Sequence, residues 1–202
     1  MDLIEVTAAD RAGFAGRPND IDYSVTERLH YLGSYFRKIP SNLTRMMENA
    51  HDWEHLPFVH PSSFAGIAPV ESGTWGWRCK TALPGSGGEQ LIELLVDNAR
   101  HYWATTVVSG AGQGTQIHTQ AANHAQGGIT VDVRFSLPQA PQSEDQSAMI
   151  LGYLQAQYAT LYDEDEALMR GRQQALDQRR DRVGEGPRAH DFGPEADLDR
   201  GQ

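Results

Sequence analysis

Residues 129–161 read ITVDVRFSLPQAPQSEDQSAMILGYLQAQYATL and join a strand pattern to a helix pattern. Apolar and polar side chains alternate over residues 129–137, which is typical of a strand with one buried and one wet face. From about Ser143, apolar residues recur at helical spacing, as Ile150, Leu154, Tyr158, Leu161, Leu168 and Leu176. A long helix that covers the apolar face of the strand would bury both surfaces, so this stretch predicts an α+β domain.

Upstream of this stretch lie further strand-like runs, separated by Gly-rich or Asn-containing turns. They span residues 74–83, 90–97, 102–108 and 115–122. We expect them to form an antiparallel meander with residues 129–137. Aromatic side chains on these runs could line an apolar pocket, but such residues more often belong to a core. They are Trp75, Trp77, Tyr102, Trp103 and Phe135. His118 lies between two glutamines on one strand face, so we expect it at the surface.

The first third of the chain is less regular. Residues 21–26 alternate as a first strand would. Apolar residues at helical spacing after Ser41 predict a helix over residues 42–55. Pro57 lacks a backbone donor and should end that helix, and irregular chain should follow to about residue 70.

Composition limits the class of protein. The chain has 202 residues, a net charge of −10 and one cysteine, Cys79. The length favours one domain over residues 1–180, whereas residues 181–202 are charged, contain Gly and Pro, and predict a disordered tail or linker. An acidic chain without a Lys/Arg stripe disfavours nucleic acid. No apolar run approaches a membrane span and the start has no leader pattern, so we expect a soluble, cytoplasmic protein.

The segment Glu48–His60, ENAHDWEHLPFVH, carries candidate metal ligands. Asp52 and His55 lie three residues apart and would share a helix face, while the break at Pro57 would let His60 fold back towards His55. Two neutral imidazoles suit Fe(II), and one carboxylate would complete a facial triad with positions open for dioxygen and substrate.

Asp165 is the candidate for the third ligand. It interrupts the apolar stripe of the predicted long helix, so its side chain should point inward, where an unpartnered carboxylate is costly. The neighbours Asp163, Glu164 and Glu166 fall mostly on the wetter sides of that helix. The alternative is that Asp165 is a solvated acid in an acidic run.

At these residues the chain resembles the catalytic domain of the Rieske-type aromatic-ring-hydroxylating oxygenases, large-subunit type. The resemblance implies that a DxxHxxxxH segment supplies two iron ligands, here His55 and His60, and that a late helix supplies the aspartate, here Asp165. It also implies that Asp52 relays electrons, and Glu48 and Asn49 match the acidic and amide residues before it. Many members have one more residue between the asparagine and the aspartate.

The resemblance further implies a START-like helix-grip fold, an antiparallel sheet wrapped on a long C-terminal helix. The implied cofactor is mononuclear Fe(II), and the implied assembly is a homotrimer. A single cysteine excludes a Rieske iron-sulfur cluster on this chain. Electrons would therefore come from a separate Rieske or reductase partner, or from a Rieske domain that follows in a longer chain.

These observations give two hypotheses. The first is the catalytic domain of a non-haem Fe(II) oxygenase of the ring-hydroxylating type, a dioxygenase or monooxygenase that acts on an apolar, aromatic substrate. The alternative is a non-redox START-like module that binds small apolar ligands. Metal content and oxygen uptake would discriminate between them.

Overall fold

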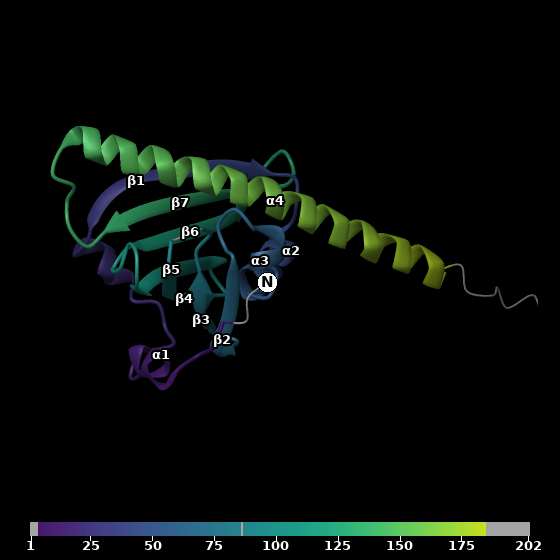
Figure 1. The fold of residues 1–202 in the computed structure, drawn as a ribbon. Coiled ribbons are helices and arrows are strands. Elements are labelled where there is room, and N and C mark those ends of the chain that lie inside the picture. Colours follow the sequence, from purple (N-terminus) through teal and green to yellow (C-terminus); the bar gives the residue numbers. More distant parts are fainter. Residues whose placement is uncertain (1–3, 86, 185–202) are drawn as a thin grey trace, which may run out of the picture.

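A long helix lies across one face of an antiparallel sheet in the computed structural model, which describes residues 4–85 and 87–184 (Figure 1). The seven strands are β1 (His30–Ile39), β2 (Gly66–Gly73), β3 (Gly76–Ala82), β4 (Glu89–Asp97), β5 (Tyr102–Ser109), β6 (Gln116–Asn123) and β7 (Ile129–Leu137). Their order in the sheet is β1-β7-β6-β5-β4-β3-β2. The helix is α4 (Glu144–Gly184), and the shorter helices are α1 (Ala8–Gly13), the 3₁₀ turn η1 (Tyr23–Glu27), α2 (Leu43–His51) and α3 (Leu56–Val59).

The core lies between the sheet and α4. Ile129, Val131, Val133 and Phe135 of β7 are completely buried, as the alternation predicts. They pack with buried residues of α4 such as Tyr162. The predicted α+β meander and its long C-terminal helix are therefore confirmed, and the four further predicted runs correspond to β3 to β6.

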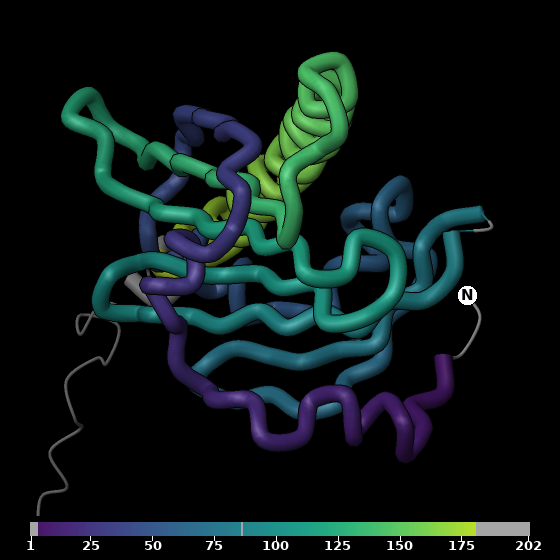
Figure 2. Tube along the Cα trace, turned by 90° about the vertical axis from the view of Figure 1, so that its left-hand side faces the viewer, coloured from purple at the N-terminus to yellow at the C-terminus, as the bar shows by residue number. Residues whose placement is uncertain are grey.

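The opposite face of the sheet is covered by the N-terminal segment, residues 4–29, which carries α1 and η1 (Figure 2). Arg78 and Glu93, on neighbouring strands, point to this side and form a buried ion pair with 2.5 Å between Nε and Oε2. Arg17 of the N-terminal segment joins them at 2.7 Å from Glu93. His118, expected at the surface, is on this side and only 1% exposed because the segment covers it.

Several predicted boundaries are wrong for local reasons. Residues 21–26 form no strand, because Asp22 accepts a hydrogen bond from the Ser24 backbone and caps η1. The first strand is β1, and β2 occupies part of the chain expected to be irregular. The predicted helix 42–55 ends at His51, and Pro57 lies in the first turn of α3, where a missing N–H is tolerated.

The helix α4 continues to Gly184, beyond the expected end of the domain at residue 180. The rest of the predicted tail, residues 185–202, lies outside the described residues. Among the residues that the structure describes, no helix is long and apolar enough to span a membrane.

Candidate metal centre

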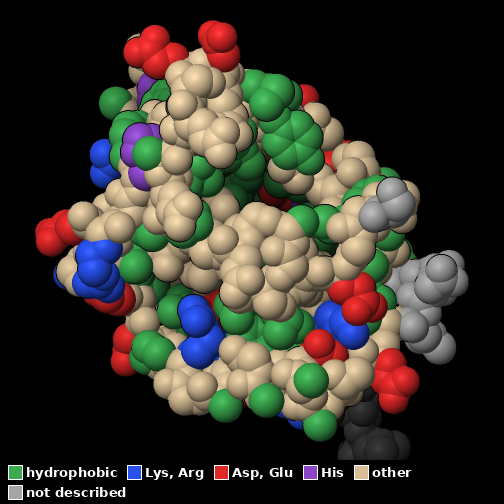
Figure 3. Space-filling view, turned by 60° about the vertical axis from the view of Figure 1, so that its left-hand side comes forward, with side chains coloured by type: hydrophobic (Ala, Val, Ile, Leu, Met, Phe, Trp, Pro, Cys, Tyr) green, Lys and Arg blue, Asp and Glu red, His purple; other side chains and the backbone are tan. Residues whose placement is uncertain are grey.

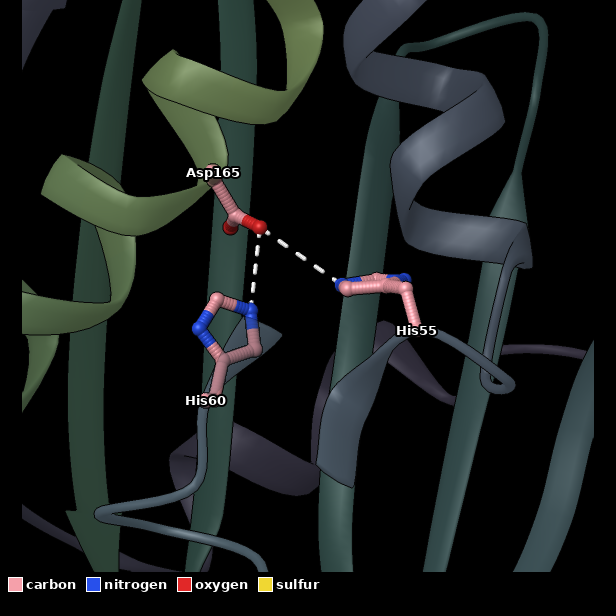
Figure 4. A group of neighbouring side chains, drawn as sticks. All are labelled: His55, His60 and Asp165. Atoms are coloured by element: carbon pink, nitrogen blue, oxygen red, sulfur yellow. Dashed lines mark ion pairs between the residues drawn. The ribbon is translucent and has the colours of Figure 1, made fainter. Parts of the chain in front are cut away.

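Two short elements place the histidines. Asp52 leaves the helical conformation after α2, and His55 then becomes the N-cap residue of α3. His60 is the C-cap residue of the same four-residue helix, so the two imidazoles stand at its two ends. Asp165 comes from the buried face of α4, and Figure 4 shows its carboxylate pointing at both rings.

The three side chains meet at one point. Asp165 Oδ1 lies 3.0 Å from His60 Nε2 and 3.5 Å from His55 Nε2 (Figure 4). The three candidate ligand atoms all lie within 4.8 Å of one another. The His60 side chain is 1% exposed, that of His55 9% and that of Asp165 11%, so water has little access to the cluster.

Charge within the cluster is mutually stabilised. Burial would raise the pKa of Asp165, but the polar contacts with His55 and His60 outweigh it and lower this pKa to about 2. Burial would lower the pKa of His60, but contacts with Asp165 and Glu164 raise it above its ordinary value. Asp165 is therefore an ionised, buried carboxylate rather than a solvated acid, contrary to the alternative drawn from the acidic run.

The cluster nevertheless leaves polar atoms unsatisfied. Within residues 4–85 and 87–184, no group makes a hydrogen bond of normal geometry to His55 Nδ1, His55 Nε2, His60 Nε2 or Asp165 Oδ1, and all four atoms are buried. Buried polar atoms without partners are rare in folded proteins and call for a water or an ion. Two imidazole nitrogens and a carboxylate oxygen aimed at one point fit a divalent transition metal.

The other sequence candidates lie around this cluster. Asn49 is 8% exposed, faces the same cavity and contributes to the low pKa of Asp165. Asp52 Oδ2 lies 4.0 Å from His55 Nδ1, too far for a hydrogen bond. Glu48 lies apart and pairs with Arg45 at 2.6 Å.

Sequence reasoning missed Glu164. It was expected on a wetter side of the helix, yet its Oε2 lies 2.8 Å from His60 Nδ1. The signal available in the sequence was its position next to the candidate ligand Asp165. That position alone did not tell which way the side chain turns.

Two neighbouring, mainly apolar pockets, the inner and outer chambers of the space between the sheet and α4, share five lining residues. The inner chamber, of about 120 Å³, borders His55, His60 and Asp165 and includes Trp77 and Trp103. The outer chamber, of about 340 Å³, lies between the sheet and the first half of α4. Both are lined by Phe64, Ile92, Thr105, Tyr158 and Leu161. Figure 3, from the side where α4 begins, shows a hollow bordered by hydrophobic side chains.

The remaining aromatic candidates do not line this cavity. Phe135 is in the core, 5.2 Å from the ring of Tyr158. Tyr102 bonds His118 on the other face of the sheet, and Trp75 lies under the Arg78 guanidinium at 4.7 Å.

Asp52 has a second environment on the outside of the molecule. It lines a surface depression of about 580 Å³ together with Glu48, His51, Asn98, His101 and Arg172. Because Asp52 also borders the inner chamber, it stands between that depression and His55.

Comparison with known proteins reveals the fold. No protein-family model and no curated protein sequence matches this chain. Among solved structures, Ara h 8.0201 is similar with a TM-score of 0.53 and 18% identity, over 71% of this chain and 99% of that one. The protein TTHA0849 from Thermus thermophilus is similar with a TM-score of 0.53 and 15% identity, over 66% of this chain and 93% of that one. Norcoclaurine synthase from Thalictrum flavum is similar with a TM-score of 0.51 and 12% identity, over 83% of this chain and 95% of that one.

These likenesses confirm the START-like helix-grip fold expected from the sequence. At such low identity they show the fold alone. The resemblance to the Rieske oxygenases still rests on the Glu48–His60 segment and Asp165.

Proposed function

We propose that this chain binds a small apolar ligand in the two-chamber cavity between the sheet and α4. The lining of both chambers supports this, because ligand pockets are concave, mostly apolar and fitted with a few polar groups. The solved norcoclaurine synthase, which shares the fold, is in complex with dopamine and hydroxybenzaldehyde. A ligand in the inner chamber would lie against the histidine–aspartate cluster.

We further propose that His55, His60 and Asp165 hold a divalent metal ion beside the inner chamber. The observation that carries this is the convergence of their buried, unsatisfied atoms on one point. Two histidines and one carboxylate form the donor set that favours Fe(II) and leaves coordination positions open. Those positions would face the apolar inner chamber.

A second candidate function follows from the metal site, namely a non-haem Fe(II) oxygenase. Bound iron would supply the oxidation of an apolar, aromatic ligand by dioxygen. The residues of the chain would orient the ligand between Trp77 and Trp103 and exclude water from the cluster. Asp52 would connect His55 to the surface depression, where a separate Rieske or reductase partner would deliver electrons.

Metal content tests the site. We expect anaerobically loaded protein to hold one Fe(II) per chain, and His55→Ala, His60→Ala and Asp165→Asn to lose it. His51→Ala is the matched control, because His51 lies on α2 near the cluster but bonds the Asn98 side chain 3.0 Å away. Equal iron in all four variants would refute the metal proposal.

Two further readouts separate the candidate functions. Binding of a neutral apolar fluorophore by metal-free protein tests the ligand proposal by itself. Oxygen uptake by the iron-loaded chain with a reduced Rieske partner and an aromatic substrate tests the oxygenase. Tight fluorophore binding by a chain that takes up no iron would support the binding module and refute the oxygenase.

A further inference from the structure

The imidazole of His60 lies between two successive carboxylates of α4. Its Nδ1 is 2.8 Å from Glu164 Oε2, and its Nε2 is 3.0 Å from Asp165 Oδ1. Neighbouring residues on a helix point about 100° apart. Asp165 therefore reaches the ring from the cavity, whereas Glu164, whose side chain is 29% exposed, reaches it from the outer side.

We propose that Glu164 is a positioning residue that fixes the tautomer and orientation of His60, so that Nε2 is the metal-binding atom. This inference rests on the proposed metal site. A metal binds the neutral form of an imidazole, which has one N–H, and an ionised carboxylate only accepts hydrogen bonds. The Glu164 contact has hydrogen-bond geometry and the Asp165 contact does not, so Nδ1 donates to Glu164 and the lone pair of Nε2 points into the cluster.

The second histidine has no comparable partner among the described residues. In the described parts of the chain, Asp52 is the only carboxylate within 4.0 Å of His55 Nδ1, and neither ring nitrogen of His55 has a hydrogen bond there. The two histidines therefore differ before any metal arrives. His60 is held in its binding orientation by a hydrogen bond from α4, whereas His55 is held by packing without a hydrogen bond. Loss of Glu164 should consequently weaken metal binding through His60 alone.

A purely structural role is the competing explanation, in which Glu164 only ties α4 to the end of α3. In that case its removal would lower the stability of the metal-free protein and leave metal affinity and the His60 tautomer unchanged. Metal affinity and tautomer are therefore the readouts that distinguish the two roles.

The experiment compares Glu164→Ala and Glu164→Gln with Asp163→Ala as the matched control. Asp163 is the preceding acid of α4, its side chain is 70% exposed, and it pairs with Arg37. In Co(II) titrations we expect Glu164→Ala to bind about 10- to 100-fold more weakly than wild type, as for loss of other partners of metal-bound histidines. Glu164→Gln keeps an acceptor and should recover most of the affinity, and Asp163→Ala should match wild type.

Long-range ¹H–¹⁵N spectra of Zn(II)-loaded protein give the second readout. We expect His60 to carry its proton on Nδ1 in wild type and Glu164→Gln, and to show mixed tautomers in Glu164→Ala. If the alanine variant fails to fold, Glu164→Met takes its place in both experiments. The methionine retains the length of the side chain but has no carboxylate to accept the hydrogen bond.

The outcomes distinguish failure of the role of Glu164 from failure of the proposed metal site. Wild-type protein that binds neither Co(II) nor Zn(II) would overturn the metal site and the role of Glu164 together. Wild-type protein that binds them, with Glu164→Ala equal to Asp163→Ala in affinity and tautomer, would overturn the role of Glu164 alone.

Discussion

Thr105 is a position where a larger side chain should block ligand binding. It lies on β5 and lines both chambers, so the larger side chain of a phenylalanine there would take up space that a ligand needs. An aromatic group buries about 150 Å² or more, which at about 25 cal/mol per Å² corresponds to roughly 4 kcal/mol of gross stabilisation. Since every 1.4 kcal/mol is about tenfold in affinity, exclusion of a ligand ring should weaken binding at least about 100-fold.

The assay is titration with N-phenyl-1-naphthylamine, a neutral probe whose emission rises when it leaves water. Thr105→Val retains the shape of the side chain and should bind the probe as wild type does. Circular dichroism and thermal unfolding serve as the control that Thr105→Phe is folded. If folded Thr105→Phe binds the probe with wild-type affinity, the ligand is not held in this cavity.

Three further predictions concern the framework of the site. Trp77 Nε1 donates a hydrogen bond to the Ala50 carbonyl, 3.0 Å away, and so connects α2 to the sheet. Trp77→Phe should therefore lower the free energy of unfolding by about 1–3 kcal/mol, as measured with urea. An unchanged free energy would contradict this role. Glu93→Ala would remove the buried carboxylate beside Arg78 and leave the guanidinium with the half-exposed Glu71, so it should lower the free energy of unfolding by about 1–3 kcal/mol. A change near zero would contradict this. Burial raises the pKa of Cys79 to about 12, so little thiolate exists below that pH, and native protein should resist iodoacetamide at pH 8 while unfolded protein reacts. Equal rates would contradict this.

The elements that could be predicted from the sequence are those with unbroken periodicity. The alternation of β7 continues for the full length of the strand, and the helical stripe of α4 runs unbroken in spacing from Ile150 to Leu176. In β1 a bulge between Tyr31 and Gly33 shifts the register, and in β2 another follows Pro69. A bulge adds a residue and reverses the phase of the alternation. Beyond its bulge β1 does alternate in burial, but Phe36 is exposed and Arg37 is largely buried, so the sequence of that strand shows no apolar period of two.

The same distinction between local and long-range signals applies to the residues of the candidate site and to His118. The proximity of His55, His60 and Asp165 could be predicted from their spacing and from the interrupted stripe, although the chain leaves the helix at Asp52 and not at Pro57. The burial of His118 could not, because it depends on the N-terminal segment packing across the far face of the sheet. That packing is a long-range contact of irregular chain, for which the sequence has no periodic signal.

The most direct test of the metal site is a crystal structure of the protein loaded anaerobically with Fe(II). We predict one ion bound by His55 Nε2, His60 Nε2 and an Asp165 oxygen, each about 2.0–2.2 Å away. An ion bound elsewhere, or imidazoles that stay apart with no ion between them in metal-soaked crystals, would contradict the account.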